Sequence, residues 1–316
     1  MQATAVEDAL RARPDDLASW LAYSDWLVGQ GDVRGTLIRL EQRLARTRPA
    51  DRPAVEREIA DLVAEHEGGW DDGWPESATV LSRRYGFATE VAVQWSNDVR
   101  EVVEQVLRGR FVTTLRITPD AKADRYNIVS RDEDWDDWDD EDEEEDDEEG
   151  EVGPAAESRL RRLDVKVLEG LDVRQLTELD LSYLDLGHDG ARLLATSLRA
   201  DRLRALGLRY CRIGDTGLAA LAASPYLSGL RRLHLQYNGL SADSMPALHR
   251  FPELTELDLR YNGIGTAGVE ALLAAPFAGS LARLWLYDSD VGEGGVRMLA
   301  HAESLPSGLR SMWRYV

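Results

Sequence analysis

The residues that could do chemistry are few in this sequence of 316 residues, and their spacing matches no common catalytic or metal-binding motif. The chain has one cysteine, Cys211, and five histidines, none of which pairs with another in the HxxxH spacing of helical zinc sites. No phosphate-binding glycine loop, serine nucleophile elbow or EF-hand loop is present. The sequence therefore predicts no catalytic residue, no cofactor, no metal ligand and no enzyme activity.

The composition predicts a cytoplasmic protein without a membrane span. A single cysteine excludes an internal disulfide framework. The longest weakly polar stretch, Gly217 to Leu230, is too short to cross a bilayer and is broken by Pro225. The first residues, MQATAVEDALRARPDD, lack the apolar segment of a secretory signal.

Most of the negative charge lies in one segment, since residues 132–149 contain 16 acids, and the other two positions are Trp135 and Trp138. Without these 16 acids the formal charge of −21 falls to −5. Such a run cannot bury apolar surface against its own repulsion, so residues 119–157 are predicted to be a disordered acidic insertion. Two interpretations stay open: a solubilising loop, or a nucleic-acid mimic or docking segment for a basic protein with both tryptophans as anchors. Direct nucleic-acid binding is disfavoured, because a polyanion would be repelled.

The C-terminal half repeats the pattern LxxLxLxx(N/C)x(L/I), which restarts at Leu176, Leu203, Leu230, Leu254, Leu281 and Leu309. Six matches at nearly constant steps of 24 to 28 residues indicate a repeat architecture. The alternating apolar residues predict a short strand in each repeat, and segments such as GDTGLAALAAS predict a following helix. Asn238, Asn262 and Cys211 occupy the strand exit, where a buried side chain must bond exposed backbone.

These repeats resemble the leucine-rich repeat superfamily, in its helix-bearing ribonuclease-inhibitor and cysteine-containing subclasses. The resemblance implies an α/β solenoid with a parallel concave sheet and convex helices over residues 158–316. Two degenerate repeats are predicted in residues 85–118, beginning at Ala88 and Val112. Residues 160–175 form either a separate strand or the convex segment of the preceding repeat, and the sequence does not decide between these.

Residues 1–84 carry helix signals and are predicted to be a helical domain that caps the first repeat. Within this range, the string from Glu7 to Glu41 resembles the short repeat-companion domain of bacterial repeat proteins, with the blocks YSDWL (23–27) and GDVRG (31–35). The resemblance implies this architecture and a bacterial source, and no activity. The stripe of Trp20, Tyr23, Trp26 and Leu27 is interpreted as core.

The side chains that point outward from the predicted strands form a regular grid that suits macromolecular binding. The candidate partner-binding residues on this grid are His234, Asp258, Arg260, Trp285, Tyr287, Trp313 and Tyr315. Exposed aromatic clusters typically form interface hot spots, although these rings could equally shield the last strand. A column of tyrosines, Tyr183, Tyr210, Tyr237 and Tyr261, is interpreted as structural stacking in preference to a ligand strip.

The sequence thus predicts a monomeric, non-catalytic scaffold whose concave face binds a protein partner, aided by the acidic loop where that partner is basic. One alternative is a regulator or inhibitor of a GTPase or nucleic-acid enzyme, since Ran GTPase-activating proteins resemble the chain in combining such repeats with an acidic stretch. The other alternative is an enzyme without a recognisable motif.

Overall fold

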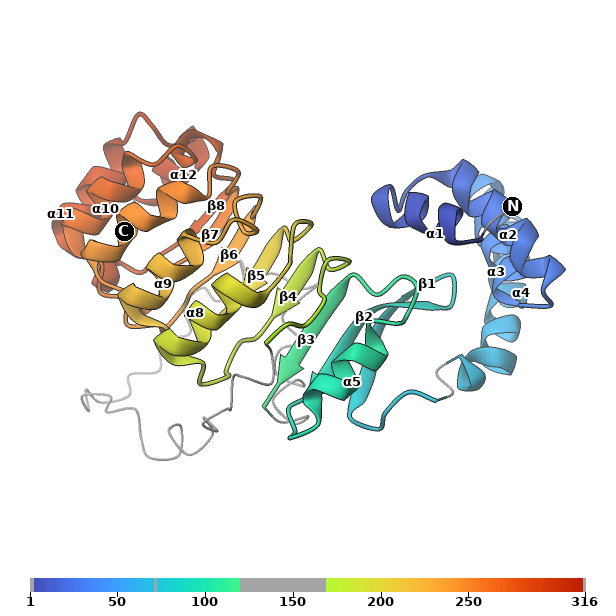
Figure 1. Ribbon diagram of the computed structural model, residues 1–316. Helices are drawn as coiled ribbons and strands as arrows, with labels where there is room; N and C mark the ends of the chain where they lie inside the picture. Colours follow the sequence, from blue (N-terminus) through green and yellow to red (C-terminus); the bar gives the residue numbers. More distant parts are fainter. Residues whose placement is uncertain (1–2, 71–72, 120–168, 315–316) are drawn as a thin grey trace, which may run out of the picture. The chain divides into compact units, whose positions relative to one another are not determined.

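The structure is a computed structural model that describes residues 3–70, 73–119 and 169–314 (Figure 1). The chain divides into two compact units, one of residues 1–92 with 101–115 and the other of residues 93–100 with 116–316. The acidic run, with Trp135 and Trp138, lies outside the described residues. The domain boundaries expected from the sequence stay predictions.

Four helices begin the first unit: α1 (Ala3–Ala12), α2 (Leu17–Gly29), α3 (Arg34–Arg46) and α4 (Arg52–His66), followed by the 3-10 turn η1 (Glu67–Gly69). The Asp16 carboxylate caps α2 by accepting a hydrogen bond from the Ala18 backbone N–H. Pro53 lies in the first turn of α4, where its missing N–H has no intrahelical partner to lose. Both features are typical of helix starts.

The range expected to be helical, residues 1–84, ends in a strand instead. Strand β1 (Ala78–Arg84) is followed by strand β2 (Phe87–Gln94), with only Tyr85 and Gly86 between them. Both of these residues have positive φ, +52° and +80°, which is the backbone of the two-residue turn that suits twisted hairpin strands. Tyr-Gly is a weaker sequence signal for this turn than Asn-Gly, and so the hairpin escaped sequence reasoning.

The range predicted to hold two degenerate repeats, residues 85–118, contains two strands and a helix, and its assignment as repeats stays a prediction. Strand β2 is followed by helix α5 (Val99–Val106) and then by strand β3 (Thr114–Thr118). The core of the first unit is aromatic: Trp20 and Tyr23 of α2 are fully buried and pack with Phe87 and Phe111. The prediction that the α2 aromatic stripe is core is confirmed, with Trp26 at its partly buried edge.

The second unit contains five short strands: β4 (Glu178–Asp180), β5 (Ala205–Gly207), β6 (Arg232–His234), β7 (Glu256–Asp258) and β8 (Arg283–Trp285). Each strand pairs in parallel with the next, and equivalent repeat positions lie opposite one another. The strands therefore form a regular ladder in which Glu178, Ala205, Arg232, Glu256 and Arg283 make one row across the sheet.

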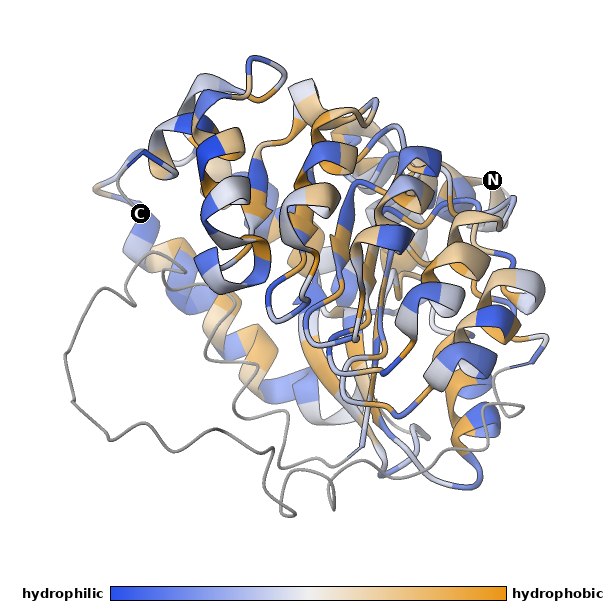
Figure 2. Ribbon diagram, turned by 90° about the vertical axis from the view of Figure 1, so that its left-hand side faces the viewer, coloured by the Kyte–Doolittle hydropathy of each residue, from blue (hydrophilic) through white to orange (hydrophobic). Residues whose placement is uncertain are grey.

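Helices follow these strands: α8 (Gly187–Ser197), α9 (Gly214–Ala222), η3 (Ala242–Arg250), α10 (Gly265–Leu273), η4 (Ala278–Ser280) and α11 (Asp288–His301). Helices α8, α9, η3, α10 and α11 pack side by side in this order along one face of the sheet (Figure 1). Helices in the structure carry both hydrophobic and hydrophilic residues (Figure 2). The third repeat has a 3-10 helix, η3, because it spans 24 residues where its neighbours span 27 and because it contains Pro246. No described helix is long and apolar enough to cross a membrane.

A buried polar ladder joins the repeats where each strand ends. The Asn262 amide donates to the Leu235 and Leu259 carbonyls, both at 2.9 Å, and its oxygen accepts from the backbone N–H groups of Asn238 and Leu240. Asn238 makes the equivalent bonds one repeat earlier, and the Cys211 thiol donates to the Leu181 carbonyl at 3.2 Å. The prediction that these three buried side chains bond the backbone at the strand exits is confirmed.

The sixth predicted repeat is wrong as a strand. Residues Ser307–Met312 form helix α12, which packs on α11, and Trp313 is buried at its end with only 7% of its surface exposed. The third inward position of this repeat holds Arg314, whose guanidinium would enter the leucine core without a partner. A short amphipathic helix keeps Leu309 and Trp313 buried and avoids that cost. Tyr315 lies outside the described residues.

Candidate functional site

The sheet face opposite the helices presents three rows of side chains, because each strand and the residues just after it contribute three outward positions. One row runs through Glu178, Ala205, Arg232, Glu256 and Arg283, and the next through Asp180, Gly207, His234, Asp258 and Trp285. The third row contains Ser182, Arg209, Gln236, Arg260 and Tyr287, two residues beyond the second.

Ion pairs cross the first row. Arg232 donates to Glu178 at 2.7 Å across the small side chain of Ala205, and Arg283 lies 3.4 Å from Glu256. His234 bridges neighbouring strands, with Nε2 at 3.1 Å from Glu256 and Nδ1 at 3.3 Å from Arg209. Burial favours the neutral form of Glu256, but the hydrogen bond and charge of His234 and the nearby arginines outweigh it, so the Glu256 pKa is lowered. Glu256 is therefore a paired carboxylate, not a free base.

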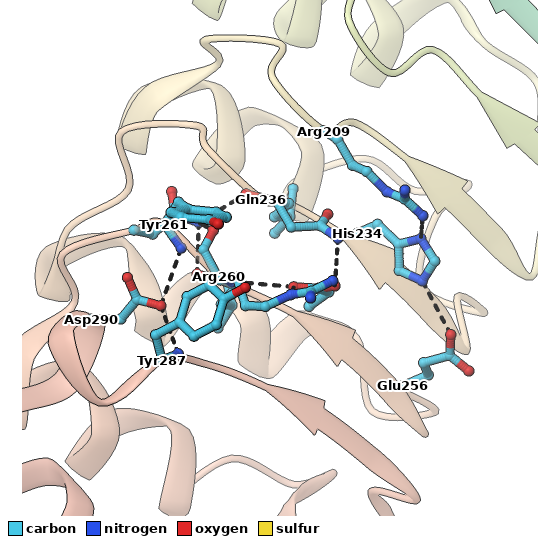
Figure 3. Close-up of polar contacts among 12 residues, drawn as sticks. Arg209, His234, Gln236, Glu256, Arg260, Tyr261, Tyr287 and Asp290 are labelled. Carbon is cyan, nitrogen blue, oxygen red and sulfur yellow. Dashed lines mark hydrogen bonds and ion pairs between the residues drawn. The ribbon is translucent and has the colours of Figure 1, made fainter. Parts of the chain in front are cut away.

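A buried polar cluster lies beside this row and fixes Arg260 (Figure 3). Arg260 donates from Nε and Nη2 to the two oxygens of Asp258, at 3.0 and 2.7 Å, while Gln236 donates to the same carboxylate. Burial disfavours the charged form of Arg260, yet Asp258 more than compensates and the Arg260 pKa is raised. The guanidinium also lies 5.9 Å from the centre of the Tyr287 ring.

Two aromatic side chains remain partly open to solvent above these charges. The Trp285 ring meets His234 edge-on with centres 6.2 Å apart, and 38% of the Tyr287 surface is exposed. Asp290 accepts hydrogen bonds from the backbone N–H groups of Tyr261 and Tyr287, at 3.1 and 2.8 Å, and so anchors the start of α11 beside the rings. We name Trp285, Tyr287 and His234 the aromatic corner.

The predicted tyrosine column is a continuous stack. Ring centres lie 5.2 Å apart for Tyr183 and Tyr210 and 4.5 Å apart for Tyr210 and Tyr237, with nearly parallel planes. Tyr261 and Tyr287 extend the stack with tilted rings at 5.5 and 4.9 Å. The four column tyrosines all have positive φ, between +54° and +67°, and the stacking offsets this unfavourable backbone. The rings therefore stack from one repeat to the next, as the structural interpretation expects.

The structure brings five predicted site residues together on β6 to β8 or just after them: His234, Asp258, Arg260, Trp285 and Tyr287. Trp313 is not among them, since it is a buried cap residue, and Tyr315, Trp135 and Trp138 lie outside the described residues. Sequence reasoning missed Asp290, although its position three residues after Tyr287 is a helix-capping signal.

The side chains of this face are mainly paired charges and partly exposed aromatic rings. Within residues 3–70, 73–119 and 169–314, no group of three or more His, Cys, Asp or Glu side chains could hold a metal ion. Cys211 is fully buried, and burial raises the pKa of its thiol, so the nucleophilic thiolate is disfavoured. The paired charges and half-exposed rings instead form a preorganised surface.

Comparison with known families supports the repeat fold. A leucine-rich repeat family model matches residues 203–222 and 252–273. Each match holds one strand and the helix after it, β5 with α9 and β7 with α10. Together with the parallel ladder, these matches support a leucine-rich repeat protein, and the fold is an α/β leucine-rich repeat solenoid with an N-terminal helical region. No curated protein matches the chain.

Proposed function

We propose that this protein is a non-catalytic scaffold whose concave sheet face binds a protein partner at the aromatic corner. Leucine-rich repeats generally serve protein–protein interaction, and such arrays are typically not enzymes. The observation that carries the proposal is the position of Trp285 and Tyr287, which are partly exposed beside two side chains that already have partners. The charge of Arg260 is paired with Asp258, and His234 is hydrogen-bonded to Glu256. Aromatic rings in such surroundings are the side chains that dominate interface energies.

The pairing of charges favours binding for a physical reason. An interface that buries an unpaired charge must supply a compensating partner, whereas Asp258 and Arg260 already satisfy each other. A partner that covers this face therefore gains the apolar area of the rings without desolvating a lone charge. The side chains are also held by hydrogen bonds, which reduces the conformational entropy lost on binding.

The acidic run, residues 132–149, is proposed to add affinity for a basic partner. Binding through this run would weaken steeply between low and moderate salt, since exposed charges are screened over about 8 Å at physiological ionic strength. Binding through the aromatic corner would be much less sensitive to salt. The regulator and enzyme alternatives rest on the sequence alone.

The test begins with affinity purification of the full chain, with and without residues 132–149, and identification of bound proteins by mass spectrometry. Calorimetry with a purified partner then compares the wild type with Trp285→Ala, for which a loss of about 2 kcal/mol, roughly 30-fold in Kd, is expected. The matched control is Tyr226→Ala, an aromatic truncation in the loop between α9 and β6. Equal affinities for all three proteins, measured on folded material, would refute the proposed site.

A further inference from the structure

The first unit contains a cavity of about 420 Å³ that the repeat array does not use. Its described lining combines three arginines with four aromatic residues: Arg34, Arg108, Arg110, Trp70, Trp74, Phe87 and Phe111. None of the described residues that line it carries a carboxylate. The volume falls within the range of small-molecule sites, which is roughly 300 to 1,000 Å³.

Arg34 is held in place by its own loop. The Asp32 carboxylate accepts from the Arg34 guanidinium at two nitrogens, Nε at 2.9 Å and Nη2 at 2.6 Å, and also from the Arg34 backbone N–H. The guanidinium carbon lies 4.2 Å from the centre of the Phe87 ring. Asp32 and Arg34 belong to the block GDVRG (31–35), whose role the repeat array leaves unexplained. This block therefore fixes one cationic wall of the cavity.

Arg110 is held by the other motif of the helical region. Its Nη1 donates to the Tyr23 hydroxyl at 2.8 Å, and Glu7 lies 3.3 Å away, while Tyr23 itself donates to Glu7 at 2.8 Å. Burial opposes the charged form of Arg110, but the bonds to Tyr23 and Glu7 raise its pKa. Tyr23 belongs to the block YSDWL, so both sequence blocks position an arginine at the same cavity.

Arg108 is exposed, and unlike Arg34 and Arg110 it forms no ion pair within the described part of the chain. Its charge therefore remains available to a ligand.

The aromatic wall of the cavity is held in place at Gly86, where an added Cβ atom would lie 3.1 Å from the Trp70 ring. The indole thus packs directly on the hairpin turn, and a larger residue would displace it.

We infer that this cavity binds a small molecule in which a planar aromatic ring is joined to a carboxylate or a phosphate. The planar fork of a guanidinium matches the oxygens of both anions, and indole and phenyl faces stack on flat rings. An anion alone would leave the aromatic wall unused, and a neutral ring would leave Arg108 without a partner. The site is independent of the concave face, and it gives the two sequence blocks a function.

Calorimetric titration of the full chain tests this inference with two aromatic anions, indole-3-acetate and adenosine monophosphate. Indole, acetate and inorganic phosphate serve as half-ligands. The variants are Arg108→Ala, which removes the available cation, and Ala88→Leu, which fills the cavity from β2. Arg57→Ala on α4 is the matched control, since it removes an exposed arginine of the same unit that does not line the cavity. Circular dichroism confirms that each variant is folded.

We expect at least one aromatic anion to bind saturably, and each half-ligand to bind at least tenfold more weakly. Arg108→Ala should weaken binding about tenfold and Ala88→Leu should abolish it, whereas Arg57→Ala should leave it unchanged. Preference for one of the two whole ligands assigns the anion as a carboxylate or a phosphate. No binding of either, equal binding of a half-ligand, or equal losses in Arg108→Ala and Arg57→Ala would overturn the inference. Because Arg108 is exposed, its variant keeps the test valid if Ala88→Leu does not fold.

Discussion

Replacement of Asn262 by alanine should be among the most damaging single changes in the array. Its side chain is buried and serves two repeats at once, as donor to carbonyls and as acceptor from backbone N–H groups. Alanine would leave the N–H groups of Asn238 and Leu240 and the carbonyl of Leu259 without this partner. The Leu235 carbonyl keeps its bond from Asn238, and so it adds little to the loss.

The expected magnitude follows from these three groups. A buried backbone group that loses its partner costs about 1 kcal/mol or slightly more, so Asn262→Ala should lower the free energy of unfolding by about 3 to 4 kcal/mol. Cys211 provides a matched comparison at the equivalent position of an earlier repeat, because its thiol is only a weak donor and its sulfur only a weak acceptor. Cys211→Ala should cost only about 1 kcal/mol, chiefly through lost packing.

Urea unfolding followed by circular dichroism measures both values, with the slope of the transition compared among the proteins. If Asn262→Ala lost less than about 1 kcal/mol, or no more than Cys211→Ala, the ladder would not stabilise the array as argued. Partial unfolding of terminal repeats would appear as a change in slope, and hydrogen exchange would then locate it.

Three further outcomes are expected. The hydrogen bond with Tyr287 and burial raise the pKa of Tyr261 to about 12, so the folded state retains this proton more tightly than the unfolded chain. The free energy of unfolding should therefore fall as the pH rises from about 10 to 12, and an unchanged pH dependence in Tyr261→Phe would contradict this assignment. Trp313→Ala should lower stability by about 3 kcal/mol without changing partner affinity, because the ring is a buried cap; a weakened affinity of the folded protein would place it at the interface instead. Replacement of residues 132–149 by a short Gly/Ser linker should leave the melting temperature equal or higher, since the run adds repulsion, and a large fall would show that it packs on the fold.

The repeat core could be predicted because its information is local and recurs. Each repeat places leucines at fixed positions, and the parallel pairing of Leu206, Leu233 and Leu257 follows once the period is known. The roles of Asn238, Asn262 and Cys211 follow for the same reason, since each backbone exit faces the same need for a buried partner. The tyrosine stack was predictable from the same period.

The ends of the array broke the period, and there sequence reasoning was less successful. The motif LRSMWRYV still matches the leucine spacing, but the burial cost of Arg314 favours helix α12, which reverses the expected role of Trp313. Strand β1 was missed because its pairing depends on a turn whose positive φ values at Tyr85 and Gly86 leave little mark on composition.

The sequence by itself determined the α/β repeat fold, the strand register and the outward grid, because a single period dictates which side chains point inward. Only the tertiary structure decided which outward residues meet. His234 reaches Glu256 and Trp285 across strands more than 20 residues apart, and Arg34 and Arg110 reach one cavity from segments separated by 76 positions. Such contacts depend on packing, chain reversal and hydrogen-bond geometry, which no local pattern of residues encodes.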